Sequence, residues 1–471
     1  MPTKTPPPEV SPPPVLPLAD IQGFVIRGYG SFTHSRHFVT VVASPTAARA
    51  LLGSLVSETS GGLRITTAAT WRVKPDYTLN VGFTYEGLKA LGVSDEVLGK
   101  FPSVFVSGAV GQAKIISDVG TSAPENWAGG MGTPGNVHAI FSLFATTQES
   151  LELHSVALRK GFAGCFSESY SHDGRALPKG RVHFGYRDGI SEPALVGGPK
   201  PSFPYPNQLG VNGRSPWGDF MLGYPNSFNE YGYSWRLAET GLGKNGSFGA
   251  FRILKQDVAA FFDYLKMEAA RVKLTSEQIA AKLLGRWSNG VPLTLSPNSD
   301  SPILEDRLNM FLYQADACGQ ANPDPIGIAC PKGAHIRRGN PRDDTVAGNF
   351  TQAHRIIRRN LPYGKEWDPL CPDDGIERGL IGYFINADLG NQFQFLMETW
   401  INKSEFAGPK IMGVDPIIGD NEAGTSEFYM PTGNEIYVSL SGFSRFVITR
   451  GSAYCFLPSI TGLGCLAAQS F

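Results

Sequence analysis

The pattern of apolar and polar residues along the first half of the chain predicts strands that alternate with helices. Apolar and β-branched residues dominate segments 36–43, 79–83 and 137–145, as is typical of β-strands. In segments 51–57 and 85–91, apolar residues recur at helical spacing. Strands followed by helices, with glycine-rich connections between them, favour an α+β fold.

The second half predicts a similar order of elements and therefore indicates a duplicated fold, although no residue-level repeat accompanies it. Segment 258–271 contains good helix formers and neither glycine nor proline. Ser276 carries a hydroxyl that can cap a second helix, which runs into segment 278–284. The other elements expected in this half are strands at 249–254, 380–386, 435–439 and 446–449 and an amphipathic helix at 392–401.

The length of the chain predicts two domains, because 471 residues exceed what one hydrophobic core usually supports. Residues 1–15 form a proline-rich arm that we expect to be disordered, since its tandem prolines cannot pack into a core. Segment 197–229 is dense in Pro, Gly and Asn and is the best candidate for a connection between domains. We therefore expect an N-terminal domain at 16–230 and a C-terminal domain at 231–471.

Composition and charge exclude several classes of protein. A net charge of −1 and a pI of about 6.7 argue against a nucleic-acid partner. The chain has no run of about eighteen apolar residues that could span a membrane. The six cysteines form no CxxC pair, which argues against zinc-ribbon and iron–sulfur sites; buried thiols and an isolated disulfide both stay open. The N-terminus has no signal-peptide pattern, so we expect either an intracellular protein or a mature secreted form.

Segment 330–342 (Cys-Pro-Lys-Gly-Ala-His-Ile-Arg-Arg-Gly-Asn-Pro-Arg) places His335 among arginines. One imidazole is enough to bind a haem iron, because one ring nitrogen can bind the metal while the other donates a hydrogen bond that fixes the tautomer. A lone histidine beside arginines is also common as a structural or surface residue. His335 taken alone therefore supports either interpretation.

Two further segments contain charged residues in settings that suit a buried polar site. In segment 184–193, glycines on both sides of Asp188 permit a tight turn and a close backbone approach to a flat ligand, although Asp-Gly is also an ordinary turn. In segment 354–364, the arginines cannot all face water if the segment is a strand. An inward Arg358 needs either an anionic ligand or an internal carboxylate partner, and both stay open.

In combination and in this order, the three segments resemble the dye-decolorising peroxidases, in the long form found in fungi. Residues 185–189 (Gly-Tyr-Arg-Asp-Gly) match the GxxDG loop of that family. His335, followed by Asn-Pro-Arg at 340–342, matches its proximal haem segment, and Arg358 before 360–364 falls at its distal arginine. Further matches, which extend the resemblance over nearly the whole chain, are 18–23, 80–85 with 87–88, 285–287 before Gly290, 378–380, 392–395 and Trp400.

The resemblance implies two ferredoxin-like domains of the dimeric α+β barrel type, with one haem b per chain held mainly by the C-terminal domain. It implies that His335 binds the iron and that Asp188 and Arg358 act on hydrogen peroxide on the opposite face. Asp188 would be the acid–base group, which predicts that the reaction works best in acid unless burial raises its pKa, and Arg358 would hold the hydroperoxide anion. The other residues assigned to the cofactor site are Arg342, Gly189, Leu380, Asn360 and Asp388. Asp388 is a candidate acceptor for the free N–H of His335, with a solvent-facing loop aspartate as the alternative.

The same resemblance implies that the protein reduces hydrogen peroxide and oxidises phenolic compounds and bulky dyes through a ferryl intermediate. Bulky substrates could hardly reach a buried haem, so Trp400 and Tyr363 are predicted to carry electrons at the surface, with simple packing as the alternative. Lignin-derived aromatics and Mn(II) are further candidate reductants; the acidic residues Asp373, Asp374 and Glu377 could hold Mn(II), with an ordinary solvated loop as the alternative. We expect an extracellular protein, because proteins of this long form are often secreted. We also expect it to be a monomer or a homodimer.

Two positions depart from the pattern common in the family. Asn360 stands where many relatives have glycine, and its amide could hold a water or a peroxide. Gly382 stands where relatives often have an aromatic residue, which predicts either a wider distal pocket or one that Tyr383 fills.

Two other functions stay open. A haem carrier or sensor of the same fold would bind haem without turning over peroxide, and the retention of Asp188 and Arg358 disfavours it. A cofactor-free α+β protein would leave the arginines near His335 unexplained.

Overall fold

The structure is a computed structural model, and it describes residues 15–57, 62–196, 214–228, 232, 234–314, 323–344, 351–406, 413–433 and 436–471. Nearly all of the predicted proline-rich arm and most of the predicted connection at 197–229 lie outside the described residues. Among the described residues, eight strands form one antiparallel sheet in the order β4-β1-β3-β2-β10-β5-β7-β6.

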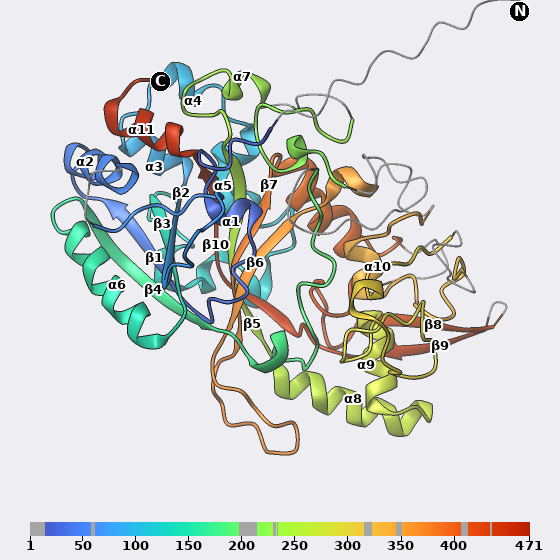
Figure 1. The fold of residues 1–471 in the computed structure, drawn as a ribbon. Helices are drawn as coiled ribbons and strands as arrows, with labels where there is room; N and C mark the ends of the chain where they lie inside the picture. The colour runs from blue at the N-terminus through green and yellow to red at the C-terminus, as the bar shows by residue number, and fades with distance from the viewer. Residues whose placement is uncertain are drawn as a thin grey trace, which may run out of the picture.

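The N-terminal half supplies four strands of this sheet, in the order β4-β1-β3-β2. One long helix, α2, connects β1 to β2, and another, α6, connects β3 to β4; both lie on the left-hand side of Figure 1. The helices of this half are α1 (Gly23–Ile26), α2 (Pro45–Val56), α3 (Tyr85–Ala90), α4 (Asp95–Leu98), α5 (Ser103–Gln112) and α6 (Gln148–Phe162). Its strands are β1 (His34–Val42), β2 (Tyr77–Phe83), β3 (Ala139–Ala145) and β4 (Phe166–Arg175).

The C-terminal half repeats this arrangement with the strand order β10-β5-β7-β6. In both halves the fourth strand pairs with the first, the first with the third, and the third with the second, so the predicted duplication of a ferredoxin-like fold is confirmed. The strands of this half are β5 (Ser247–Gln256), β6 (Ile357–Tyr363), β7 (Gly379–Asn386) and β10 (Val447–Leu457), with a separate hairpin of β8 (Glu427–Gly433) and β9 (Ile436–Ser441). Its helices are α7 (Trp235–Ala238), α8 (Val258–Val272), α9 (Ser276–Leu284), α10 (His335–Gly339), the π-helices η10 (Gly390–Gln394) and η11 (Leu396–Ile401), and α11 (Ile460–Ala468).

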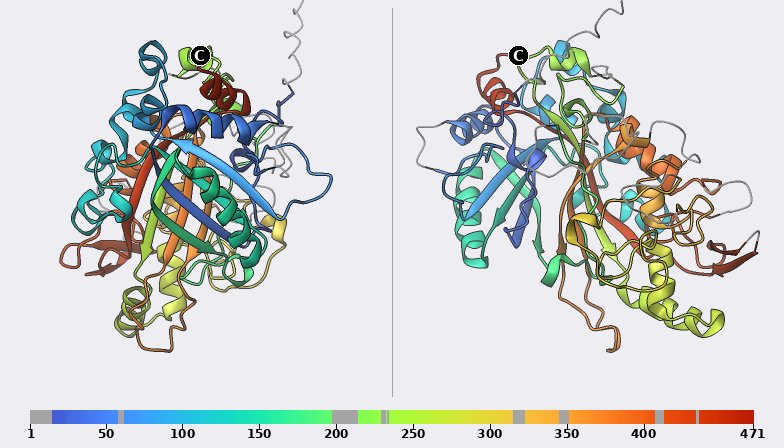
Figure 2. Two further views of the ribbon diagram at one scale, coloured as in Figure 1. Left: turned by 90° about the vertical axis from the view of Figure 1, so that its left-hand side faces the viewer. Right: turned by 45° about the vertical axis from the view of Figure 1, so that its right-hand side comes forward.

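The two halves join through β2 and β10, and the outer edges of the sheet meet on the other side. Phe83 of β2 pairs with Phe456 of β10. At the far edges, the ring of His172 in β4 lies 4.4 Å from that of Tyr363 in β6. The sheet therefore curls into an α+β barrel. Helices α9 and α10 and the β8–β9 hairpin lie together on the side away from α2 and α6 (Figures 1 and 2).

Most predicted elements lie within a few residues of the observed ones, and the differences have local causes. The second helix of the C-terminal half is capped by Thr275, not Ser276: the Thr275 hydroxyl accepts from the Gln278 backbone N–H, and the Gln278 side chain accepts from the Thr275 backbone N–H. The predicted helix at 392–401 forms, but with π-helical hydrogen bonding. Strand β4 was not predicted, because this outer strand is mostly polar and largely exposed.

One exclusion and one open alternative from the sequence can be compared with the structure. No helix in the described part of the chain combines the length and apolar character needed to cross a membrane. The described cysteines (Cys165, Cys330, Cys371, Cys455 and Cys465) are all free thiols, so no disulfide joins any two of them.

Candidate active site

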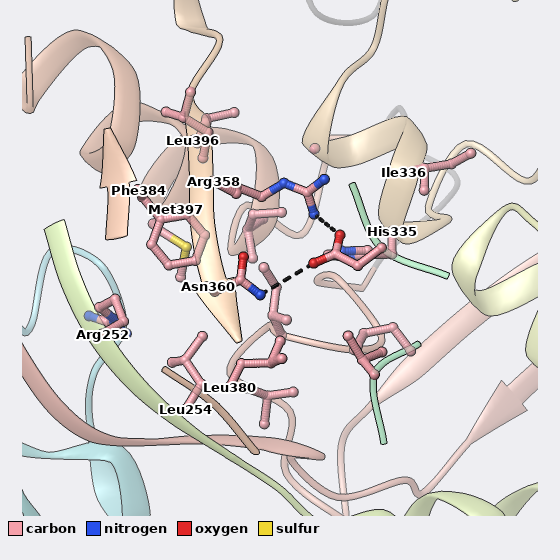
Figure 3. Close-up of a pocket in the computed structure, with 18 of the residues that line it drawn as sticks. Arg252, Leu254, His335, Ile336, Arg358, Asn360, Leu380, Phe384, Leu396 and Met397 are labelled. Atoms are coloured by element: carbon pink, nitrogen blue, oxygen red, sulfur yellow. Dashed lines mark hydrogen bonds and ion pairs between the residues drawn. The ribbon is translucent and has the colours of Figure 1, made fainter. Parts of the chain in front are cut away.

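A cavity of about 310 Å³ lies between the loop that follows β4, the strands β5, β6 and β7, and the helices α10 and η11. Apolar side chains from three of these elements face it, among them Leu254, Leu380, Phe384, Leu396 and Met397 (Figure 3). Seven residues assigned to the cofactor or to catalysis from sequence line this cavity: Asp188, Gly189, His335, Arg342, Arg358, Asn360 and Leu380. The fold thus brings together segments that lie far apart in the chain.

His335 begins α10 and is oriented by a buried carboxylate. Its Nδ1 lies 2.9 Å from Oδ2 of Asp415, whose side chain is 0% exposed. Burial raises the pKa of Asp415, but His335, the Ile418 amide and Arg338 together hold it below its ordinary value. An ionised carboxylate can only accept a hydrogen bond, so Nδ1 carries a proton, and in the neutral imidazole the lone pair is then on Nε2. This is the tautomer that a metal ligand requires.

The prediction that Asp388 accepts from the free N–H of His335 is wrong. The Asp388 carboxylate is engaged within its own turn: it accepts from the backbone N–H groups of Gly390 and Asn391, each at 3.0 Å, and from the Asn391 amide at 2.8 Å. An aspartate at the start of a turn favours such local capping, and here the Gly390-Asn391 pair begins two residues after Asp388. No sequence signal identified Asp415, which lies 80 residues from His335 along the chain.

Two of the arginines beside His335, Arg337 and Arg338, are held by contacts with other residues of the chain. Arg337 pairs with Asp344 at 2.6 Å, and its guanidinium carbon lies 4.1 Å from the ring centroid of Tyr313. Arg338 donates to the backbone carbonyl of Trp400 at 2.6 Å. Both arginines are fully buried. These contacts account for the two arginines without any cofactor, so their presence does not distinguish a haem protein from a cofactor-free one.

Arg342 lines the cavity but is also held by the chain. Its Nη1 donates to the backbone carbonyls of Asn309 at 3.1 Å and Phe311 at 2.9 Å, and its guanidinium carbon lies 3.8 Å from the centroid of the Phe311 ring. Its role toward a cofactor stays a prediction.

The second polar group in the cavity is a cluster of Asp188, Arg358 and Asn360. Arg358 Nη1 donates to Asp188 Oδ1 at 2.7 Å, and Asn360 Nδ2 donates to Asp188 Oδ2 at 3.3 Å (Figure 3). The loop can present the carboxylate because Gly185 and Gly189 take positive φ angles, 85° and 77°, which residues with a side chain rarely adopt. Arg358 reaches Asp188 from the second residue of β6.

Opposing effects act on the two charged members of this cluster. Burial raises the pKa of Asp188, but the charge of Arg358 and hydrogen bonds from Gly189 and Asn360 lower it below its ordinary value overall. Burial lowers the pKa of Arg358, but Asp188 and Glu192 raise it overall. At neutral pH the cluster is therefore an ion pair, and the Asp188 carboxylate is available as a proton acceptor.

Glu192 completes this cluster and was not identified from the sequence. Its Oε1 accepts from Arg358 Nε at 2.9 Å, and its Oε2 accepts from the Arg358 backbone N–H at 3.0 Å. The Glu192 side chain is 8% exposed. The only signal available in the sequence was its place in the loop, four residues after Asp188 and directly before Pro193.

Gly382 leaves one wall of the cavity without a side chain. Tyr383 does not fill the space: it points to the other face of β7, where it packs against Phe24 and Phe251. The prediction that Tyr383 fills the pocket is therefore wrong. A Cβ on Gly382 would lie 2.0 Å from the Arg359 carbonyl oxygen, so the close approach of β6 and β7 requires glycine here.

Neither of the residues predicted to act at the surface lies there. Trp400 is 2% exposed and Tyr363 is 4% exposed. Trp400 packs against the rings of His354 and Phe395, with centroids 5.3 Å and 5.4 Å away. The hydroxyl of Tyr363 donates to Glu377 at 3.0 Å. The prediction that either side chain is exposed to bulky substrates is therefore wrong, whereas a role in electron transfer is untested.

The acidic residues considered for Mn(II) do not converge on one point. Asp374 pairs with Arg378 at 2.5 Å, while Glu377 accepts from Tyr363. The Asp373 carboxylate accepts from the backbone N–H of Gly375. Within the described ranges, no group of three or more His, Cys, Asp or Glu side chains is placed to hold a metal ion. These carboxylates therefore do not form the manganese site considered above.

The residues present in the cavity fit a haem. The walls are apolar, one imidazole is locked with its Nε2 lone pair available, and a separate ion pair can bind a small polar ligand. Such a set can hold an iron porphyrin and move a proton on a ligand such as peroxide.

Comparisons with known proteins agree with this chemistry. A family model described as the DyP dimeric alpha+beta barrel domain matches residues 55–178. The chain is 32% identical to the dye-decolorizing peroxidase msp1 of Mycetinis scorodonius, over 95% of this chain and 87% of the relative. A dye-decolorizing peroxidase of Exidia glandulosa shows the same identity and the same coverage.

Solved structures extend the comparison to the fold. A dye-decolorizing peroxidase in complex with 2,6-dimethoxyphenol superposes with a TM-score of 0.80 at 26% identity, over 96% of this chain and 100% of that one. A fungal DyP-type peroxidase from Auricularia auricula-judae gives the same values. The likeness thus covers both halves of the sheet.

Proposed function

Because the chain belongs to the dye-decolorising peroxidase family, we propose that it is a haem peroxidase that reduces hydrogen peroxide and oxidises phenolic compounds and dyes. The observation that carries the proposal is the Asp188–Arg358 ion pair in the same cavity as the Nε2 lone pair of His335. Hydrogen peroxide would take up two electrons and two protons and leave as water, while the aromatic reductant supplies the electrons.

His335 would hold the haem iron through Nε2, with Asp415 fixing the ring and increasing its basicity. Leu254, Leu380, Phe384 and Met397 would contact the porphyrin as apolar walls. The haem, as one b-type group per chain, would supply the cleavage of the peroxide O–O bond and store the oxidising equivalents.

Asp188 and Arg358 have different roles in the reaction with peroxide. A carboxylate oxygen of Asp188 accepts a proton from one peroxide oxygen and returns it to the departing oxygen, which needs only one group within reach of both atoms. Arg358 stays protonated, donates N–H to the resulting anion and stabilises the charge on the leaving oxygen. Asn360, which donates to Asp188, orients the carboxylate for this transfer.

Electrons from substrates too large for the cavity require a path through the protein. We assign this role to Trp400, because its helix η11 also supplies cavity residues Leu396 and Met397. Trp400 contacts His354, which is half-buried and stacks on Phe395 at 3.8 Å. Tyr363 is a second candidate, since Glu377 can accept its proton on oxidation. Lignin-derived aromatics as reductants, an extracellular location and a monomeric or homodimeric state stay predictions.

An absorption spectrum of the haem-reconstituted protein, with and without His335→Ala, tests the cofactor assignment. We expect a Soret band whose position and intensity depend on His335. Addition of peroxide to the wild type and to Asp188→Asn tests the acid–base assignment, and we expect the reaction to slow by about 10²- to 10⁴-fold in the variant. A haem-loaded wild type that does not oxidise dyes with peroxide would instead indicate a carrier or sensor.

A further inference from the structure

Glu192 holds the backbone and the side chain of Arg358 at the same time, and no other described carboxylate does both. Its two oxygens accept from the Arg358 backbone N–H at 3.0 Å and from Nε at 2.9 Å. Glu192 lies in the loop that carries Asp188, whereas Arg358 lies in β6 of the other half of the barrel. The contact therefore fixes the loop and the strand relative to each other at the point where the catalytic pair meets.

The geometry at Arg358 divides its N–H groups between two carboxylates. Glu192 accepts a hydrogen bond from Nε, and Asp188 accepts one from Nη1 at 2.7 Å. A guanidinium is planar, so fixing Nε and Nη1 fixes the direction of the whole group. The Arg358 side chain is 32% exposed and lines the cavity. The two contacts therefore set the direction in which its remaining N–H groups point.

A carboxylate is required at position 192 because three N–H groups converge on it. The third comes from Arg359, whose Nη1 lies 3.5 Å from Glu192 Oε2. A glutamine would offer one acceptor oxygen and turn an NH₂ group toward an N–H donor. The charge also matters, since burial lowers the pKa of Arg359 while Glu192 acts against that effect.

We infer that Glu192 is a positioning residue for the peroxide-binding side of the cavity: it orients the Arg358 guanidinium toward that side and offsets the positive charges of Arg358 and Arg359. The inference rests on the proposed peroxidase function. Glu192 touches neither peroxide nor haem in this role and acts through Arg358 alone. Its loss should therefore impair the reaction with peroxide while leaving the oxidation of the reductant intact.

Three variants of the haem-loaded enzyme test this role. Glu192→Gln keeps the size and removes the charge, and Glu192→Asp keeps both oxygens with a shorter reach. Glu305→Gln is the matched control, because Glu305 pairs with Arg187 of the same loop at 2.6 Å and does not contact Arg358. We expect kcat/KM for hydrogen peroxide to fall about tenfold in Glu192→Gln, to be partly restored in Glu192→Asp, and to be unchanged in Glu305→Gln.

Two further readouts separate positioning from a merely structural effect. Fluoride binding, followed by the absorption spectrum, should weaken in Glu192→Gln in parallel with peroxide reactivity, because a bound anion accepts from Arg358. In the Arg358→Lys background, which lacks Nε and the guanidinium plane, adding Glu192→Gln should cause little further loss. kcat/KM for the reducing dye should stay within about twofold of wild type throughout.

The outcomes that would overturn the inference differ from those that would overturn the proposed function. A wild type without a Soret band or without peroxidase turnover contradicts the function. An active wild type with a Glu192→Gln variant that matches Glu305→Gln contradicts the positioning role. Losses in the two single variants that add in the double variant contradict it as well, and so does failure of Glu192→Gln to fold combined with a folded Glu192→Asp that shows no change toward peroxide.

Discussion

The imidazole of His335 donates a hydrogen bond of 2.9 Å from Nδ1 to the fully buried carboxylate of Asp415. Asp415 is itself held in place, because its other oxygen accepts from the backbone N–H groups of Ile417 at 2.8 Å and Ile418 at 2.9 Å. A ligand imidazole supported in this way keeps one tautomer and one orientation.

The first prediction concerns haem affinity. Asp415→Asn should weaken haem binding by about 10- to 100-fold, since the amide either donates toward Nδ1 or accepts more weakly than a carboxylate. Titration of the apoprotein with haem measures this change. Asp388→Asn is the matched control, because Asp388 bonds only within its own turn, and its affinity should equal that of the wild type. Equal effects of both substitutions would contradict the assignment.

The second prediction concerns the pH dependence. The pKa of Asp188 lies below its ordinary value of 3.8, so the carboxylate stays ionised as the pH falls toward that value. The acid limb of kcat/KM for peroxide should therefore lie below about pH 4. In Arg358→Leu, burial of Asp188 is no longer opposed by the arginine, so its pKa should rise and the acid limb should move to higher pH. A limb that stays in place would show that another group titrates.

The same shift contributes to the stability of the fold. Because the pKa of Asp188 is lower in the folded protein, its ion pair stabilises the fold at a pH above the unfolded value, and that contribution is lost as the pH falls through the folded value. Unfolding by urea at several pH values, in the wild type and in Asp188→Asn, measures it. The difference between the two proteins should shrink as the solution is acidified.

The third prediction concerns Arg337, one of the two buried arginines beside His335. Arg337→Ala should destabilise the protein by about 3–5 kcal/mol, because it removes the guanidinium that pairs with the buried carboxylate of Asp344. Lys100→Ala removes an ion pair with the exposed Glu96 and should cost at most about 1 kcal/mol. Urea unfolding of the two variants compares these costs. If Arg337→Ala lowered haem affinity and left the stability unchanged, Arg337 would be a cofactor residue after all.

The fourth prediction concerns electron transfer. Trp400→Phe should lower the turnover of bulky dyes several-fold and leave the reaction with peroxide unchanged, because only the exit of electrons is affected. Steady-state turnover of a dye, combined with stopped-flow mixing with peroxide, separates the two steps. Trp217→Phe replaces another buried tryptophan that does not line the cavity and should change neither. Equal dye turnover in both variants would exclude Trp400 from the path.

Much of the fold could be predicted from the sequence because its signals are local. The apolar runs of β2, β3, β5 and β7 are long and buried, so their composition alone indicated strands. Strand β4 could not be recognised, since an outer strand with polar, exposed side chains lacks that pattern. The π-helical bonding of η11 and the Thr275 cap depend on contacts that composition does not encode.

The sequence by itself determined the family resemblance and, through it, the three segments assigned to the site. Taken alone, His335, Asp188 and Arg358 each remained open to a structural role, and only the ordered match of their three segments to the dye-decolorising peroxidases indicated a haem site. Only the tertiary structure decided their partners, because a buried charge takes whichever opposite charge or donor the packing places beside it. Asp415 lies 80 residues from His335 along the chain, and Glu192 lies 166 residues from Arg358. Periodicity and spacing carry no information over such sequence separations.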